Sequence, residues 1–244
     1  MQATGHSIKG RKPAQEDSYL IAHIPGKGLL VLVADGVGGH GHGDFASQLC
    51  VAWFKKAFEQ QEISDPQAFL RRTAEEVAYQ VYQKGVSMPE YKNAGTTLTG
   101  FWVMGDQYYW INIGDSRVYL FDRNRQLHQL TKDHSLVQEY VDQGILTPEQ
   151  ARLHPQRNMM FNAIGVPPED LQVDVAGPFD LHDGDALLAT SDGVHDTFSQ
   201  EKMQEFLQTL HEEPDLMRLL VETSFDAGSK DNITACYYVH QENE

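Results

Sequence analysis

Residues 29–40 read Leu-Leu-Val-Leu-Val-Ala-Asp-Gly-Val-Gly-Gly-His, an apolar run that ends in a carboxylate and a glycine-rich loop. A continuous aliphatic run of this length, stopped by Asp-Gly, predicts a buried β-strand. Asp35 then lies at the rim of a sheet, and Gly36 has no side chain to keep its carbonyl oxygen away from a bound ion. This stretch therefore predicts a sheet that carries a functional group at its edge.

The patterns on either side of this strand predict further strands and two pairs of helices. Apolar runs bounded by turn residues indicate strands at residues 19–24, 28–34, 96–104, 108–113, 117–121, 171–176, 186–190 and 233–240. Helical spacing of apolar residues predicts helices over residues 45–57, 66–84, 201–210 and 215–225, the second capped by Asp65 and ended by Gly85. Strand runs interrupted by helix pairs indicate sheets with helices packed outside them, and not an alternating βαβ fold.

The composition is that of one globular domain, residues 1–244, with 41% apolar and 22% charged residues. A formal net charge of −16 argues against nucleic acid as a partner, because contacts to its phosphates need clustered Lys and Arg. No apolar run approaches the roughly 20 residues of a membrane helix, and residues 1–17 lack the apolar core of a signal peptide. We therefore expect a cytoplasmic protein with no membrane partner.

Five aspartates share one context, since each stands beside an apolar strand run. They are Asp17, Asp35, Asp115, Asp192 and Asp231. Any one alone would be interpreted as a turn residue, because Asp-Gly at a strand end is common in turns. Five together at one sheet edge would repel one another and shift one another's pKa unless cations neutralised them. A ligand set made of carboxylates favours Mg²⁺, Mn²⁺ or Ca²⁺ over Zn²⁺, which prefers His or Cys.

The glycine-rich loop after Asp35 offers two rival interpretations. His40 and His42 could be metal ligands, but no HExxH or comparable spacing supports that, and they are expected to be loop residues near the site. Residues 38–43 could also cradle a phosphate, yet they lack the GKS/T ending of a P-loop and the GxGxxG of a dinucleotide-binding turn. The glycines are expected instead to let the loop pass close to a metal ion.

Six groups of residues, taken in chain order over nearly the whole sequence, carry a resemblance to a known family. They are Gly10-Arg11-Lys12-Pro13-Ala14-Gln15-Glu16-Asp17; Asp35-Gly36-Val37-Gly38-Gly39-His40; Ala94-Gly95-Thr96-Thr97 with Gly114-Asp115-Ser116-Arg117; Asp133-His134-Ser135 with His154-Pro155 and Arg157-Asn158; Ser191-Asp192-Gly193-Val194; and Asp231-Asn232-Ile233-Thr234. Together they resemble the motifs of the PPM family, the type 2C metal-dependent Ser/Thr protein phosphatases, in its bacterial branch. Each motif alone is weak, but all six in order are specific.

The resemblance implies an α+β fold: a four-layer α/β-β/α sandwich of two antiparallel sheets flanked by helix pairs, with a small helical flap at about residues 134–158. It also implies two or three Mn²⁺ or Mg²⁺ ions, whose ligands would be Asp17, Asp35, Gly36, Asp115, Asp192, Asp231 and Glu16. Asp35 would bridge two ions, and Asp115 with Asp192 would hold a third. The implied catalytic residues are Asp35, Asp192, Asp231 and Asp17.

The implied activity is hydrolysis of phosphoserine and phosphothreonine in proteins by a water activated between two metal ions. The partners would be phosphorylated proteins, in opposition to a bacterial Ser/Thr kinase. Two other functions stay open: a non-catalytic or weakly catalytic signalling or scaffold module, and a small-molecule phosphatase on the same fold. Retention of all five aspartates argues against the scaffold, because a protein freed from catalysis need not keep converging charges.

Two positions depart from the family pattern. Lys12 stands where the family commonly has an arginine that anchors the substrate phosphate, with Arg11 beside it. A lysine is a point charge and does not replace a guanidinium fork, so either Lys12 suffices or Arg11 swings in. Val37 stands where eukaryotic relatives often place a histidine as general acid, so leaving-group protonation must come from elsewhere, with His40 one candidate. The flap could gate access to the site or be only a solvated insertion.

Overall fold

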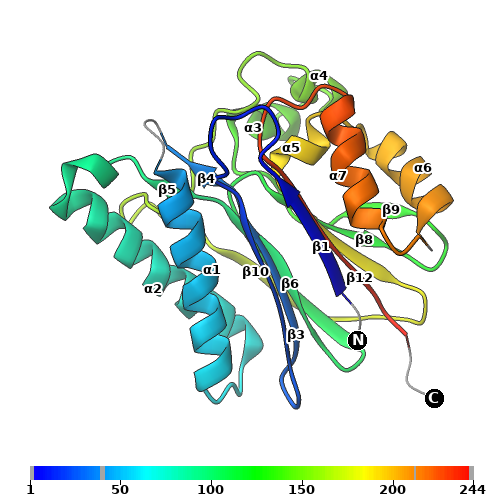
Figure 1. Cartoon of the computed structure of the whole chain (residues 1–244), viewed down its shortest axis with the longest axis horizontal. Coiled ribbons are helices and arrows are strands. Elements are labelled where there is room, and N and C mark those ends of the chain that lie inside the picture. Colours follow the sequence, from blue (N-terminus) through cyan, green and yellow to red (C-terminus); the bar gives the residue numbers. More distant parts are fainter. Residues whose placement is uncertain (1–2, 39–41, 212, 242–244) are drawn as a thin grey trace.

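Two antiparallel sheets lie face to face in the middle of the molecule (Figure 1). The computed structural model describes residues 3–38, 42–211 and 213–241. The first sheet consists, in spatial order, of β1 (Ala3–Ile8), β12 (Ile233–Val239), β11 (Ala186–Thr190), β8 (Arg117–Phe121) and β9 (Leu127–Gln129). The second consists of β10 (Asp174–Asp180), β7 (Gln107–Ile113), β6 (Leu98–Met104), β3 (Gly28–Ala34) and β2 (Ser18–Ile24). A short two-stranded pair is formed by β4 (Gly36–Val37) and β5 (Gly95–Thr96). In the chain, β4 follows β3 and β5 precedes β6.

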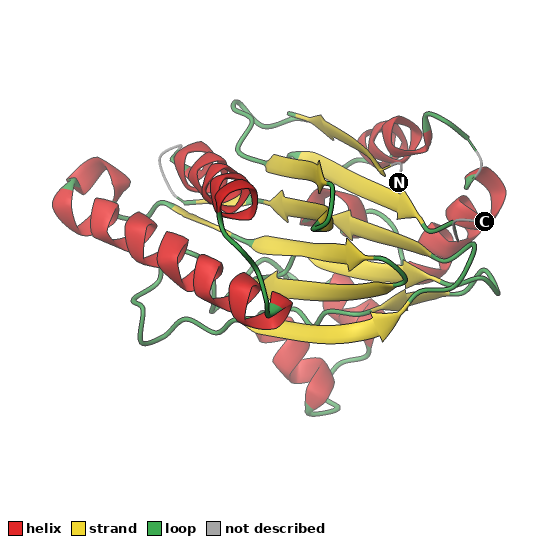
Figure 2. Ribbon diagram, turned by 90° about the horizontal axis from the view of Figure 1, so that it is seen from below, coloured by secondary structure: helices red, strands yellow, loops and turns green. Residues whose placement is uncertain are grey.

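Helix pairs cover the two outer faces and complete the predicted four layers. The long helices α1 (Gly43–Gln60) and α2 (Pro66–Ser87) pack on the second sheet, and α6 (Gln200–Leu210) and α7 (Leu216–Asp226) pack on the first. Figure 2 shows the strands enclosed between these helices. The short helices are η1 (Pro89–Tyr91), α3 (Leu136–Asp142), α4 (Pro148–Arg152) and α5 (Asp192–His195).

The apolar run of β3 is continuous because both of its faces are covered. Leu30 and Leu32 pack into the cluster under α1 and α2, whereas Val31 and Val33 pack between the two sheets. Successive side chains of a strand point to opposite faces, so a strand buried on both sides needs apolar residues at every position. The chain leaves this buried strand at Asp35, which places that carboxylate at the rim as the sequence predicts.

Residues 134–158 form helical pieces over the end of the sandwich that carries α5, as expected for the flap (Figure 1). A capping box begins α4: the Thr147 side chain accepts from the Gln150 N–H, and the Gln150 side chain accepts from the Thr147 N–H. The chain returns to the core through a bridge between Thr96 and Ile164.

Several element boundaries differ from the sequence-based ones. Helix α2 is capped by Asp65 as predicted, but it continues through Gly85 to Ser87. A β-carbon on Gly85 would lie 3.0 Å from the Tyr91 carbonyl oxygen, so this glycine gives η1 room to pack against the helix. The strand predicted at residues 171–176 is shifted to Asp174–Asp180, where pairing with β7 is irregular between Ala176 and Phe179.

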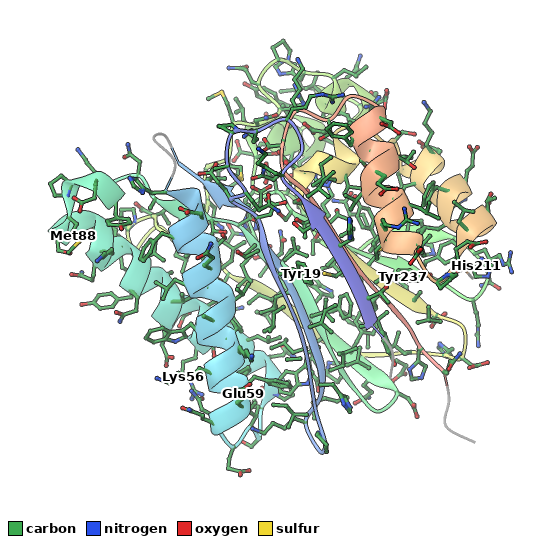
Figure 3. All side chains as sticks on the ribbon, in the orientation of Figure 1. Tyr19, Lys56, Glu59, Met88, His211 and Tyr237 are labelled. Carbon is green, nitrogen blue, oxygen red and sulfur yellow. The ribbon has the colours of Figure 1, made fainter. Side chains whose placement is uncertain are left out.

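Strand β1 was not predicted, because its sequence Ala-Thr-Gly-His-Ser-Ile is mostly polar. It is an edge strand that pairs only with β12, from Ala3 with Tyr238 to Ile8 with Ile233. The ring of Tyr19 on β2 lies against Gly5 of β1, where the edges of the two sheets meet (Figure 3). An edge strand with one exposed side needs few apolar residues, so its hydrophobic pattern is weak.

Candidate active site

The segments that carry the five aspartates meet at one end of the sandwich, beside α5, β4 and the flap (Figure 1). Asp17 precedes β2, Asp35 follows β3, Asp115 joins β7 to β8, Asp192 begins α5 after β11, and Asp231 precedes β12. Their closeness is evident from the effect of their charges on the pKa of Asp35. Burial raises the pKa of Asp35 well above its ordinary value, and the charges of the other four carboxylates raise it further. Antiparallel strands from both sheets thus deliver one carboxylate each to a common rim.

Backbone contacts fix the position of Asp35. The Asp35 carbonyl oxygen accepts from the Thr97 N–H at 2.8 Å and from the Thr96 hydroxyl at 2.9 Å. The next residue, Gly36, donates its N–H to the Glu16 carbonyl oxygen at 3.2 Å. A β-carbon at Gly36 would lie 2.5 Å from backbone atoms of both Glu16 and Gly43, so only glycine fits there. The backbone therefore packs closely around Gly36, next to the Asp35 carboxylate and near the site.

Asp17 is held by two hydroxyl groups from the other sheet. Its Oδ2 accepts from the Thr234 hydroxyl at 2.6 Å and from the Ser191 hydroxyl at 2.9 Å. Its Oδ1 is buried and accepts from no N–H or hydroxyl group among the described residues. Burial raises the pKa of Asp17 to about 6, although the two hydroxyls act in the opposite direction. Thr234 and Ser191 thus orient one oxygen of the carboxylate and leave the other for a different ligand.

Asn232 connects three segments that hold site residues. Its amide group donates to the Lys9 and Ala14 carbonyl oxygens at 2.7 and 2.9 Å, and its side-chain oxygen accepts from the Glu16 N–H at 2.8 Å. Its carbonyl oxygen lies so close to Gly193 that a β-carbon there would be 2.0 Å away. Asn232 therefore fixes the loop before β2 and the start of α5 relative to β12.

Asp192 and Asp115 lie on the side of the site nearest the flap. Burial raises the pKa of Asp115 to about 7, and the charge of Asp133 adds to the increase. Burial and the charge of Asp115 also raise the pKa of Asp192 well above its ordinary value. The Asp192 Oδ1 atom is buried and has no hydrogen-bond partner in the described part of the chain.

The two candidate phosphate anchors point to different places. The Lys12 Nζ atom lies 2.7 Å from Asp231 Oδ1. Burial lowers the pKa of Lys12, but its contact with Asp231 outweighs this and the pKa is raised. The Arg11 guanidinium instead donates to the Ser229 carbonyl oxygen at 2.6 Å and lies 4.5 Å from the centroid of the Phe225 ring. Of the two, Lys12 is the one directed at the carboxylates.

The sequence offered three other candidates for the site: Glu16, His42 and His40. The Glu16 side chain accepts from the Gly43 N–H at 3.3 Å, at the start of α1. The ring of His42 packs on Tyr91, with 4.8 Å between centroids. His40, the candidate general acid, lies outside the described residues.

The donor set fits hard divalent cations. Every converging side chain offers carboxylate oxygen, the ligand that Mg²⁺ and Mn²⁺ prefer. The buried Oδ1 atoms of Asp17 and Asp192 accept from no N–H or hydroxyl group in the described ranges, and a buried unpaired carboxylate oxygen is costly unless something positive meets it. Within the described ranges no group of three or more acidic, His or Cys side chains is arranged to hold a metal ion as the chain stands. The five carboxylates therefore line a common rim without forming a closed ligand cluster, and Lys12 lies 2.7 Å from one oxygen of Asp231.

A cavity of about 510 Å³ opens beside the carboxylates, between the flap and the core. Asp115 and Asp192 contribute to its wall, together with Arg117 and Arg157. Both arginines form ion pairs near the flap. Arg117 of β8 binds both oxygens of Asp133, the residue just before the flap, with the shortest distance 2.6 Å. Arg157 of the flap reaches Asp196, just after α5, at 3.0 Å.

His134 joins the base of the flap to the site. Its Nδ1 accepts from the N–H of Gly114, the residue before Asp115, at 3.1 Å, and its Nε2 lies 3.1 Å from Asp174 Oδ2. The His134 ring stacks on Phe161. His134 thereby links the start of the flap to the backbone next to Asp115.

The raised carboxylate pKa values predict how the stability of the metal-free protein depends on pH. Asp17 and Asp115 bind protons up to about pH 6 and 7 when folded, but only up to about pH 3.9 when unfolded. The folded state thus holds more protons in this window, and its stability falls as pH rises. Buried His195, whose pKa is lowered, contributes with the opposite sign.

The difference in Tm between Mn²⁺-loaded and EDTA-treated protein removes the contribution of His195, which is common to both. We expect this difference to grow from pH 5.5 to pH 7.5, because Mn²⁺ relieves the repulsion that deprotonation creates. Differential scanning fluorimetry in both conditions measures it. A difference that stays constant or shrinks over this range would contradict the electrostatic description of the site.

Comparison with known proteins gives consistent matches over nearly the whole chain. A family model described as Protein phosphatase 2C matches residues 4–221. The protein phosphatase PhpP of Streptococcus pneumoniae is 32% identical over 231 residues, which cover 92% of each chain.

Solved structures agree with these sequence matches. The serine/threonine phosphatase Stp1 of Staphylococcus aureus superposes with a TM-score of 0.90 at 29% identity, covering 98% of this chain and 95% of that one. The catalytic domain of the phosphatase PstP in complex with two manganese ions gives a TM-score of 0.83 at 29% identity, with 97% and 96% coverage. No helix in the described part of this chain has the length and apolar character needed to cross a membrane.

Proposed function

Because this chain belongs to the protein phosphatase 2C family and is a protein serine/threonine phosphatase, we propose that its five converging aspartates form the catalytic metal centre. The observation that carries this proposal is the convergence itself: four of the carboxylates raise the pKa of Asp35, and two buried oxygens accept from no N–H or hydroxyl group among the described residues. The proposed ligands of two or three Mn²⁺ or Mg²⁺ ions are Asp17, Glu16, Asp35, Gly36, Asp115, Asp192 and Asp231. Support for the metal comes from the two manganese ions bound by the related PstP domain.

When bound, the ions supply a nucleophile from water at neutral pH and offset the charge of the phosphate. The protein residues hold the proposed metal ligands in position. Ser191 and Thr234 hold Asp17, backbone contacts hold Asp35, and Asn232 holds the segments that carry Glu16 and Asp192. Because none of these contacts has to form during the reaction, the site is organised before substrate arrives.

A cysteine nucleophile does not fit this site. Cys50 and Cys236 are both buried, and burial raises the pKa of each thiol far above neutrality. Since the thiolate is the reactive form, neither sulfur attacks a phosphate at neutral pH. We propose direct attack by water in place of a cysteine nucleophile.

The geometry favours Lys12 over Arg11 as the phosphate anchor. We expect Lys12→Ala to raise KM for p-nitrophenyl phosphate about tenfold at saturating Mn²⁺, the value of one charge-assisted hydrogen bond. Arg11→Ala is expected to change KM by less than about twofold, because its side chain is bound to Ser229 and Phe225. Steady-state kinetics of both variants measures the difference, and a larger effect of Arg11→Ala would reverse the assignment.

The substrate class is proposed to be phosphoserine and phosphothreonine proteins, in opposition to a bacterial Ser/Thr kinase. A kinase needs ATP, so this role places the protein in the cytoplasm. The open cavity beside the carboxylates supports a polypeptide substrate, because it extends the site along the flap. A panel of phosphothreonine peptides, sugar phosphates and nucleotide monophosphates tests the class. We expect the highest kcat/KM for the peptides; a higher value for a small metabolite would instead indicate a small-molecule phosphatase.

A further inference from the structure

The Lys12 ammonium group lies against one of the site carboxylates. Among the described residues, Lys12 is the only Lys or Arg that forms an ion pair with any of the five aspartates, through Asp231 Oδ1 at 2.7 Å. Its neighbour Arg11 is bound to Ser229. The Lys12 ammonium group therefore neutralises part of the negative charge of the metal-free site.

The same contact opposes metal binding. Asp231 Oδ1 already accepts from Lys12 and from the Asn232 N–H at 2.8 Å, which leaves only Oδ2 for an ion. An ion on Oδ2 would lie within a few ångströms of the ammonium, and like charges at that distance repel strongly. The Lys12–Asp231 pair and a divalent ion at Asp231 are thus mutually unfavourable.

We propose that Lys12 is an internal counter-ion of Asp231 that the incoming metal ion displaces, and that the displaced ammonium then receives the substrate phosphate. This inference rests on the proposed metal centre. The side chain of Lys12 is 38% exposed and has a flexible four-carbon stem, so it moves without disturbing the core. One residue then stabilises the empty site and anchors the substrate in the loaded one.

A thermodynamic link between metal and phosphate follows. A phosphate that draws the ammonium away from Asp231 removes the repulsion and strengthens metal binding, and the metal strengthens phosphate binding by the same factor. Part of the coupling free energy between metal and phosphate depends on the charge of Lys12, and it is lost when that charge is removed.

Binding of Mn²⁺ to the metal-stripped full-length chain tests the proposal without relying on catalysis. The measurement is a titration followed by the EPR signal of free Mn²⁺, or by calorimetry. We expect Lys12→Met to bind Mn²⁺ about fivefold tighter than wild type, as expected for loss of one partly exposed ion pair. Lys12→Arg, which keeps the charge, is expected to match wild type within about twofold.

A matched control distinguishes the effect of losing the Lys12–Asp231 ion pair from the effect of losing any nearby positive charge. Lys230→Met removes the same charge from an exposed lysine next to Asp231 in the chain. We expect it to change Mn²⁺ affinity by less than about twofold, because exposed charges are screened by solvent. Equal tightening in Lys12→Met and Lys230→Met would overturn the counter-ion role, as would unchanged or weaker Mn²⁺ binding in Lys12→Met.

The Asp231→Asn variant distinguishes failure of this inference from failure of the metal centre. If wild type binds Mn²⁺ and Asp231→Asn binds fewer ions, the centre stands, and the Lys12 variants decide the inference alone. If wild type binds no Mn²⁺, both are wrong. A second readout is the effect of inorganic phosphate on Mn²⁺ affinity, which should tighten binding more in wild type than in Lys12→Met. Equal tightening in the two proteins would contradict the proposed coupling.

Discussion

Replacement of Asp35 by asparagine is expected to lower kcat at least about 1000-fold, because this carboxylate is the proposed bridge between two ions. The same change is expected to make the metal-free protein more stable. Asp35 is buried among four other carboxylates that raise its pKa, and a neutral amide of the same shape removes that repulsion. A gain of about 1 kcal/mol would raise Tm by roughly 2–4 °C for a chain of this length.

Steady-state kinetics with Mn²⁺ and a thermal melt in EDTA measure the two effects of Asp35→Asn. Asp106→Asn is the matched control, because it makes the same chemical change at the largely exposed side chain of Asp106, in the turn between β6 and β7. The control should leave both kcat and Tm nearly unchanged. Loss of stability in Asp35→Asn with activity retained would mean that the carboxylate has only a structural role.

Asp192→Asn and Asp115→Asn are expected to differ strongly in activity, although both carboxylates face the flap side of the site. We propose that Asp192 would hold one of the two ions that Asp35 holds as well as the third ion, so its loss should cost about 1000-fold in kcat. Asp115 is proposed to hold only the third ion, and its loss should cost about 10- to 100-fold. The contrast follows from the number of ions that each carboxylate holds.

Kinetics over a range of Mn²⁺ concentrations distinguishes the two variants. Asp115→Asn should recover part of its activity at high Mn²⁺, since the two ions that Asp35 holds keep their ligands, whereas Asp192→Asn should not recover. Equal losses in the two variants, both insensitive to Mn²⁺, would contradict the proposed division of ligands.

The residues of the site were predictable where the signal is local. Asp35 follows a run in which every residue is apolar, and that run exists because β3 is buried on both faces. Asp192 likewise follows the fully buried strand β11, although the sequence did not predict that it begins the short helix α5. A strand end marked by Asp-Gly is visible in one short window of sequence, and the helix pairs are equally visible through their periodicity.

The contacts that hold those residues were not predictable, because they join distant parts of the chain. Thr234 and Asp17 lie 217 residues apart and Asn232 and Glu16 lie 216 apart, yet each pair is hydrogen-bonded. No local pattern distinguishes these residues from ordinary polar neighbours of a strand. The choice between Lys12 and Arg11 was equally hidden, since it depends on the ring of Phe225 on α7.

The most direct test of the central claim is turnover of a phosphothreonine peptide by the wild-type chain in Mn²⁺, in EDTA, and in EDTA followed by excess Mn²⁺. Phosphate release is followed in all three conditions, with circular dichroism to show that the protein stays folded. We predict turnover with Mn²⁺, none in EDTA, and full recovery when Mn²⁺ is restored. Undiminished turnover in EDTA, or none in Mn²⁺ from folded protein, would contradict the assignment of the five aspartates as a catalytic metal centre.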